Sequence, residues 1–218
     1  MKILIVSGFL GAGKTTFIKR LARNVDQRFA ILENEYGAAG IDGARLGQNR
    51  QGTQKNVWEM TEQCICCIGK KDFAASVLTI ANVVDPEYLI VEPTGVGSLA
   101  RIIENLRQIE YERIQLLSPV TIVDVYSYRR YMAEYPELYQ DQIRSADTII
   151  VSKTEACQAE EKQRIQKFLQ EINSQAKIIT DYASTMTRED YQSLLLGGRY
   201  EKEVQDTQSG EKMPETFS

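Results

Sequence analysis

Short apolar runs alternate with longer amphipathic stretches along most of this chain. Runs rich in valine and isoleucine are typical of strands covered on both faces, and apolar residues recurring every three or four positions are typical of helices. Strands are predicted at 2–7, 29–34, 56–60, 88–92, 119–125, 147–153 and 177–180. Helices are predicted at 14–24, 72–83, 98–109, 126–134, 137–145, 158–173 and 187–196. This alternation predicts an α/β fold with a mostly parallel sheet and helices on both faces.

Two segments do not follow the alternation. Residues 35–56 are rich in glycine and polar side chains and show no period, and loops of this length in compact domains are usually functional. Residues 199–218 are polar and are predicted to form a loose tail. Because no internal repeat and no second set of strands is found, residues 1–198 are predicted to form a single domain.

Composition excludes some classes of function. The net charge of −4 and the pI of about 5.2 leave no basic surplus for binding a nucleic acid. No apolar run approaches the roughly 18 residues of a membrane span, and nothing resembles a signal peptide. Four cysteines in 218 residues do not make a disulfide scaffold. The totals predict a cytoplasmic protein with no membrane partner.

The segment GFLGAGKT, residues 8–15, matches the phosphate-binding pattern G-x-x-x-x-G-K-[ST] and lies between a predicted strand and a predicted helix. Glycines let backbone N–H groups surround a phosphate, and the helix start adds its positive dipole end. Lys14 would contact the β- and γ-phosphates, and the Thr15 hydroxyl would ligate Mg²⁺. The alternative is a glycine turn that happens to carry a lysine. The predicted phosphate-binding residues are Gly8, Gly11, Ala12, Gly13, Lys14, Thr15 and Thr16.

A second motif, LIVEPTG at 89–95, is an apolar strand that ends in an acid and is followed by a turn. In P-loop proteins such an acid holds the Mg²⁺ shell or positions water, which is the role predicted for Glu92. Gly95 would sense the γ-phosphate through its backbone N–H. Lys14, Glu92 and Gly95 are therefore the predicted catalytic residues, and a P-loop NTPase is the predicted fold.

The segment SKTE at 152–155 follows another predicted strand. GTPases carry Asn-Lys-x-Asp at this place, where the carboxylate accepts from guanine and the lysine stem covers the base. Ser152, Lys153 and Glu155 are predicted to bind the base, although serine and glutamate weaken the preference for GTP over ATP. The alternative is a helix N-cap followed by acids.

Cys64, Cys66 and Cys67 lie within four residues, and the chain has no histidine. Thiolates at this spacing can converge on one soft or borderline metal and leave a fourth position for water, a carboxylate such as Glu33, or a partner's ligand. Buried structural cysteines, a redox pair and a structural zinc site remain alternatives. Cys157 is expected to be remote. Zinc and cobalt are both reasonable.

Taken in order, these motifs resemble those of the CobW/HypB/UreG family of P-loop GTPases, and of its CobW branch in particular. The matching strings are GFLGAGKTT (8–16), ENEYG (33–37), GID (40–42), CICC (64–67), EPTG (92–95) and SKTE (152–155). There are departures from the family pattern. Ala38 stands where an acid is frequent, histidine-rich stretches are absent, and CobW-type chains usually continue into a second domain.

The resemblance implies GTP hydrolysis with Mg²⁺, coupled to delivery of a transition metal (Zn²⁺ or Co²⁺) to a client metalloprotein or corrinoid system. It also implies a nucleotide-dependent homodimer or a docking surface for a client. Carried over by position, Glu33 and Asp42 lie near Mg²⁺ or the transferred metal, so Asp42 joins Thr15 and Glu92 as a predicted magnesium residue. The alternatives are an ATP-using small-molecule kinase and a non-enzymatic metal-buffering or regulatory module.

Overall fold

The computed structural model describes residues 1–33, 57–61, 70–197 and 200. Its strands are β1 (Lys2–Gly8), β2 (Phe29–Glu33), β3 (Val57–Thr61), β4 (Tyr88–Glu92), β5 (Gln115–Leu116), β6 (Val120–Asp124), β7 (Thr148–Ser152) and β8 (Lys177–Ile179). Its helices are α1 (Lys14–Asn24), α2 (Lys70–Val83), α3 (Leu99–Arg107), α4 (Tyr128–Glu134), α5 (Pro136–Arg144), α6 (Ala159–Ile172), α7 (Tyr182–Thr185) and α8 (Arg188–Leu196).

The strands form one parallel sheet with β1 near its centre. The order is β3-β2-β4-β1-β6-β7-β8, and β5 pairs with β1 outside this path. After β1 the chain first builds β2 to β4 on one side and then β6 to β8 on the other. The connections therefore diverge at the carboxyl end of β1, which in open α/β sheets is where ligands bind.

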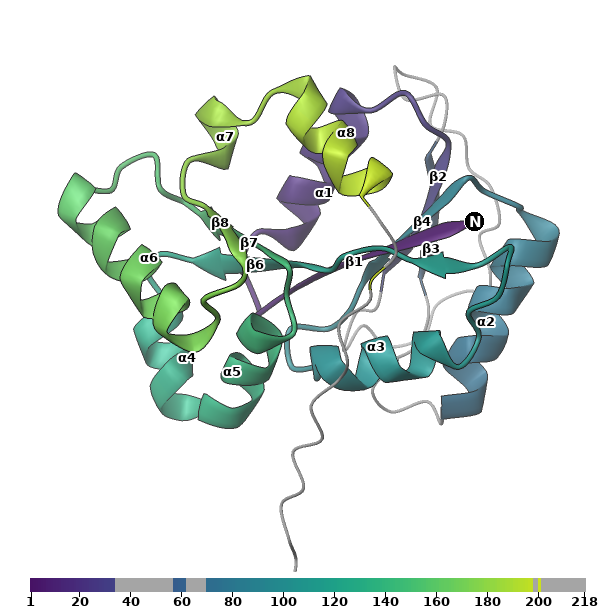
Figure 1. Cartoon of the computed structure of the whole chain (residues 1–218), viewed down its shortest axis with the longest axis horizontal. Coiled ribbons are helices and arrows are strands. Elements are labelled where there is room, and N and C mark those ends of the chain that lie inside the picture. Colours follow the sequence, from purple (N-terminus) through teal and green to yellow (C-terminus); the bar gives the residue numbers. More distant parts are fainter. Residues whose placement is uncertain (34–56, 62–69, 198–199, 201–218) are drawn as a thin grey trace, which may run out of the picture.

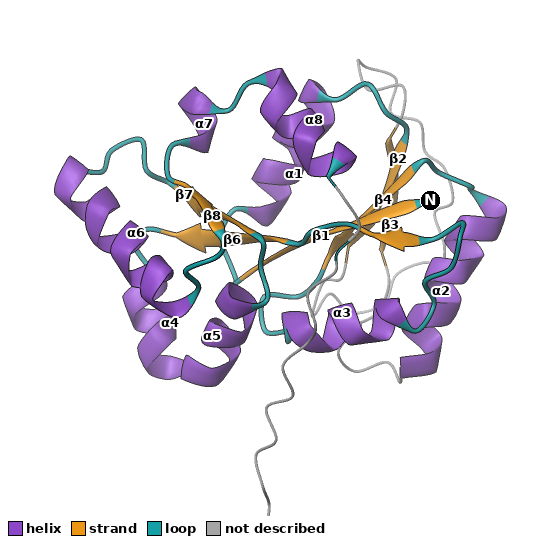
Figure 2. Cartoon of the chain, in the orientation of Figure 1, coloured by secondary structure: helices purple, strands orange, loops and turns teal. Residues whose placement is uncertain are grey.

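Both faces of the sheet are covered by helices, because successive side chains of a strand point to opposite faces. Ile3 and Ile5 pack with α2 and α3, whereas Leu4 and Val6 pack with α1, α7 and α8. A third buried cluster joins β6 and β7 to α4, α5 and α6. Figures 1 and 2 show α1, α7 and α8 on one side of the sheet and α2 to α5 on the other. The predicted parallel sheet with helices on both faces is confirmed.

The predicted helices and strands are all found in the described part of the chain, with shifts of a few residues at their ends. The sequence did not predict β5 and α7, which have two and four residues and are too short to show a period. None of the described helices is long and apolar enough to cross a membrane.

The predicted loop at 35–56 and most of the predicted tail lie outside the described residues. Tyr200 is described, and it is buried in the cluster that contains α2 and α3. Its backbone N–H donates to the carbonyl oxygen of Leu116 at 2.9 Å. The chain beyond α8 therefore returns to β5 at this residue.

Candidate nucleotide site

The loop between β1 and α1 has the backbone of a phosphate cradle. Gly13 has a φ of 98°, a left-handed conformation that favours glycine, and it is the residue from which α1 begins. Gly8 has a φ of 144°, and a Cβ there would lie 2.4 Å from the carbonyl oxygen of Ile122 on β6. Glycine at these two positions allows the turn into the helix and the close approach to β6.

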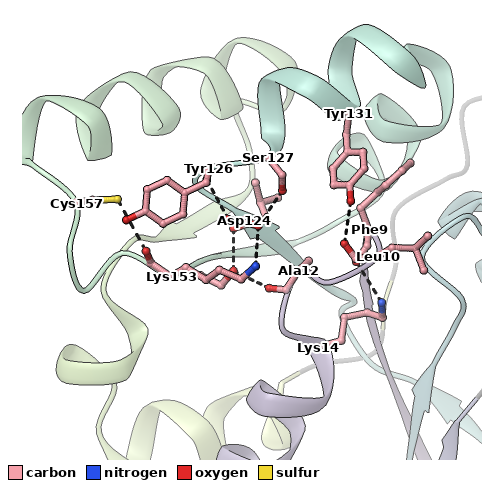
Figure 3. A network of polar contacts seen from close by, with 12 residues as sticks. Phe9, Leu10, Ala12, Lys14, Asp124, Tyr126, Ser127, Tyr131, Lys153 and Cys157 are labelled. Carbon is pink, nitrogen blue, oxygen red and sulfur yellow. Dashed lines mark hydrogen bonds and ion pairs between the residues drawn. The ribbon is translucent and has the colours of Figure 1, made fainter.

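Lys14 is buried and folds back over this loop. Its Nζ donates to the carbonyl oxygens of Gly8 at 3.0 Å and Phe9 at 3.3 Å, as Figure 3 shows for Phe9. Burial lowers the pKa of Lys14, and the negative charge of Glu92 opposes this shift. A buried ammonium held by neutral carbonyl groups suits an anionic ligand, because a phosphate would compensate its charge.

The start of α1 and the end of β4 are joined by their polar side chains. The Thr15 hydroxyl donates to Glu92, at 2.9 Å from Oε1 and 3.2 Å from Oε2. A hydroxyl and a carboxylate beside a phosphate cradle fit Mg²⁺, which binds oxygen and prefers one or two carboxylates together with phosphate oxygens. The third predicted magnesium residue, Asp42, lies outside the described residues.

Gly95 lies directly against the cradle. A Cβ at this position would be 2.3 Å from the Leu10 nitrogen and 2.8 Å from the Phe9 carbonyl carbon. The loop after β4 therefore packs backbone to backbone against the loop after β1. This contact places Gly95 beside the cradle, as its predicted role requires.

The SKTE segment occupies the end of β7 and the turn after it. Ser152 is buried, and its hydroxyl donates to the Ala12 carbonyl at 2.6 Å. The side chain thus ties β7 to the phosphate cradle. Lys153, with a φ of 61°, and Glu155 are both exposed, as groups that contact a base must be. The Thr154 hydroxyl donates to Asp181 Oδ1 at 3.2 Å.

Asp124, at the end of β6, holds the lysine of this segment and was not predicted as a site residue. It accepts from Lys153 Nζ at 2.8 Å, the Tyr126 backbone N–H at 2.9 Å and the Ser127 hydroxyl at 2.8 Å (Figure 3). Burial alone would raise the pKa of Asp124, but these bonds outweigh it and hold the pKa below its ordinary value. The sequence signal was an acid at a strand end, TIVD, the same signal that pointed to Glu92.

Asp181, just after β8, was also missed. Its carboxylate accepts from Lys162 Nζ at 2.6 Å as well as from Thr154. The hydrogen bond from Lys162 is the largest cause of the lowered pKa of Asp181. The pair joins α6 to the segment after β8, beside the SKTE turn.

The predicted transition-metal residues Cys64, Cys66 and Cys67 lie outside the described residues, and so does the side chain of Glu33. Within the described ranges no group of three or more histidine, cysteine, aspartate or glutamate side chains could hold a metal ion. Cys157 is described and is a free thiol. The backbone of β2 pairs Glu33 with Glu92 of β4 on one side and Thr61 of β3 on the other.

The comparisons with known proteins agree with this geometry. The family model of the CobW/HypB/UreG nucleotide-binding domain matches residues 2–180. The chain belongs to the CobW/HypB/UreG family. The resemblance stated from the motifs is thereby confirmed.

Several curated relatives are named zinc chaperones. The chain is 30% identical to the zinc chaperone YeiR of Escherichia coli, over 80% of this chain and 53% of that protein. It is 27% identical to the zinc chaperone CobW of Pseudomonas aeruginosa, over 82% of this chain and 56% of that protein. This CobW-family chain thus spans about half the length of the curated relatives it matches.

Solved structures of the family share the fold. The Zn(II)-bound YjiA GTPase from Escherichia coli superposes with a TM-score of 0.61 at 24% identity, covering 83% of this chain and 57% of that chain. The hydrogenase maturation factor HypB from Archaeoglobus fulgidus gives 0.55 at 17% identity, covering 90% and 89%. At these identities the likeness shows the fold alone.

Proposed function

We propose that this chain binds GTP with Mg²⁺, hydrolyses it to GDP, and couples hydrolysis to the binding and delivery of Zn²⁺ or Co²⁺ to a client metalloprotein or corrinoid system. The observation that carries the proposal is the joining of Lys14, Thr15 and Glu92 at one phosphate cradle. Membership of the CobW/HypB/UreG family supports the link to metal handling.

In this proposal the residues of the cradle have separate roles. Lys14 moves from the carbonyls of Gly8 and Phe9 to the β- and γ-phosphates, where its charge stabilises the charge that develops during hydrolysis. Thr15 and Glu92 would hold Mg²⁺, which would supply positive charge to neutralise the phosphates. Asp42 is proposed as a further oxygen ligand.

At the base, Lys153 is proposed to cover the guanine ring with its alkyl stem, and Asp124 keeps that stem in place. Glu155 is proposed to accept from the guanine N–H groups. Ser152 supports the phosphate side of the site through its bond to Ala12. GTP is therefore the proposed nucleotide, and a panel with ATP tests the choice.

The metal site is proposed to consist of Cys64, Cys66, Cys67 and Glu33. The register supports this set, because Thr61, Glu33 and Glu92 end three neighbouring strands in one row and Cys64 follows Thr61 by three residues. A metal site at this edge would adjoin the γ-phosphate side of the cradle. Loss of the γ-phosphate would then change metal affinity.

Metal affinity in the two nucleotide states tests the coupling. Zn²⁺ and Co²⁺ are titrated against a chelating dye with the protein in Mg²⁺ and either a non-hydrolysable GTP analogue or GDP. The expected difference is about tenfold or more, a typical allosteric coupling, and Lys14→Ala should abolish it. Equal affinities in both states would refute the coupling.

The same variant and the same nucleotide states also distinguish the proposed function from the alternative ones. A pure metal buffer would keep its metal affinity unchanged in Lys14→Ala and in both nucleotide states. A clear preference for ATP, with phosphoryl transfer to an added acceptor, would favour a kinase. Light scattering in GDP and in the GTP analogue tests the proposed nucleotide-dependent homodimer.

A further inference from the structure

Helix α5 holds the loop that carries Gly95. This loop, residues 93–98, connects β4 to α3 and is called here the β4–α3 loop. The Gln142 side chain is buried, and its Nε2 donates to the carbonyl oxygens of Gly95 at 3.1 Å and Gly97 at 2.9 Å. A single amide from α5 thus holds two peptide units of the loop.

The neighbouring residue of α5 holds the end of the same loop. Asp141 Oδ2 accepts from the backbone N–H of Leu99 at 2.7 Å and of Ala100 at 3.4 Å, the first two residues and hence the positive end of α3. Helix α3 already has a side-chain cap, because Ser98 Oγ accepts from the Arg101 N–H at 3.2 Å. Asp141 therefore adds a contact between helices to a helix end that is capped locally.

The loop held by α5 also touches the phosphate cradle, and so does α4. A Cβ on Gly95 would lie 2.3 Å from the Leu10 nitrogen, and the Tyr131 hydroxyl of α4 donates to the Leu10 carbonyl at 3.1 Å (Figure 3). The ring of Phe9 packs against Tyr131 and Tyr139, with centroids 4.4 Å and 5.4 Å apart. Helices α4 and α5 therefore contact both loops that would surround a γ-phosphate.

Packing alone does not favour a buried amide at Gln142. Its Oε1 is buried and has no hydrogen-bond donor among the residues that the structure describes. An unpartnered buried polar atom is unfavourable, so an apolar side chain of the same size would serve packing better. The amide is therefore better explained by the two hydrogen bonds that Nε2 donates to the β4–α3 loop than by packing.

We propose that Gln142 and Asp141 are positioning residues that fix Gly95 relative to the γ-phosphate and so let α5 distinguish a triphosphate from a diphosphate. The inference rests on the proposed function, since it needs a nucleotide in the cradle. It adds that the nucleotide state is transmitted to α4 and α5 through the β4–α3 loop.

Replacing the amide tests this directly. Gln142→Met keeps the length of the side chain and removes both donated bonds. Two lost hydrogen bonds predict roughly a tenfold fall in GTP affinity relative to GDP affinity and in kcat, with GDP affinity within about twofold of wild type. General destabilisation would weaken both nucleotides alike, so the ratio of the two affinities isolates positioning. Gln140→Met is the matched control, because Gln140 lies on the same helix and contacts Met132 and Arg144.

The outcomes are distinguishable. If wild type binds no nucleoside triphosphate, the proposed function fails and the inference fails with it. If wild type distinguishes GTP from GDP and a folded Gln142→Met does so equally well, only the inference is overturned. If Gln142→Met does not fold, wild-type hydrogen exchange decides. The Leu99 and Ala100 amides, held by Asp141, should exchange more slowly with a GTP analogue than with GDP, and equal rates would overturn the proposal.

Discussion

Asp124 is a buried acid that the fold keeps ionised. Three donors converge on its carboxylate, and their combined effect on its pKa exceeds that of burial. Lys153 is about half exposed, with 47% of its side chain accessible, whereas 9% of the Asp124 side chain is accessible. Asp124 is therefore the fixed partner of the ion pair, and the pair orients the alkyl stem of Lys153.

This arrangement predicts a pH-dependent contribution to stability. The pKa of Asp124 is lower in the folded chain than in the unfolded chain, so the stabilisation is complete above about pH 5 and is lost as the pH falls through the folded pKa. Asp124→Asn should lower the free energy of unfolding by about 1–2 kcal/mol at pH 7, and the difference from wild type should shrink below about pH 4. Urea unfolding at several pH values measures this. Glu112→Gln, at an exposed position outside the helices, is the control and should change the free energy of unfolding by about 0.5 kcal/mol or less at pH 7. If the difference in free energy of unfolding between Asp124→Asn and wild type stayed constant down to about pH 3, the lowered pKa of Asp124 would be contradicted.

At the scale of elements, the contact between the β4–α3 loop and the cradle depends on the absence of a side chain. At Gly95 a Cβ would meet backbone atoms at 2.3 Å and 2.8 Å, which cannot move without displacing the cradle. At Gly97 the nearest atom, the Thr94 carbonyl oxygen, would be 3.3 Å away. The same substitution at these two sites therefore has different consequences.

Gly95→Ala is expected to lower the free energy of unfolding by about 1–3 kcal/mol, as overpacking does, and to weaken GTP binding at least tenfold. Gly97→Ala, in the same loop, should cost about 1 kcal/mol or less and leave GTP binding within a few-fold of wild type. Chemical denaturation and nucleotide titration of both variants measure the difference. Equal effects at the two glycines would contradict the close packing at Gly95.

The elements themselves were largely predictable from sequence, because buried strands and amphipathic helices have local periods. The motif residues Lys14, Thr15 and Glu92 were predictable too, since their spacing is fixed by the chemistry of phosphate and Mg²⁺. Gln142 and Asp181 were not predictable. The carbonyl groups that Gln142 contacts lie 45 and 47 residues away along the chain. The two donors to Asp181 come from the turn after β7 and from α6, and no local pattern encodes such contacts.

At the scale of the whole molecule, Tyr200 connects the chain after α8 to the opposite face of the sheet. Helix α8 packs with α1, whereas Tyr200 belongs to the cluster of α2 and α3. The guanidinium of Arg107 lies 5.0 Å from the centre of the Tyr200 ring, and burial raises the pKa of its hydroxyl. Tyr200, which lies beyond the predicted domain boundary at 198, thus contributes to the core on the face of the sheet opposite α8.

The contribution of this link can be measured by removing the ring. Tyr200→Ala should lower the free energy of unfolding by about 3–4 kcal/mol, as expected for an aromatic residue removed from a core. Tyr200→Phe keeps the ring and its contact with Arg107 and should cost about 1 kcal/mol or less. Tyr126→Ala, at a site where 57% of the residue is exposed, is the control for loss of a tyrosine and should change stability by about 0.5 kcal/mol or less. If Tyr200→Ala behaved like Tyr126→Ala, residue 200 would be dispensable for closing the fold, and the domain boundary predicted at 198 would stand. A loss near the expected value would extend the cooperative unit to residue 200.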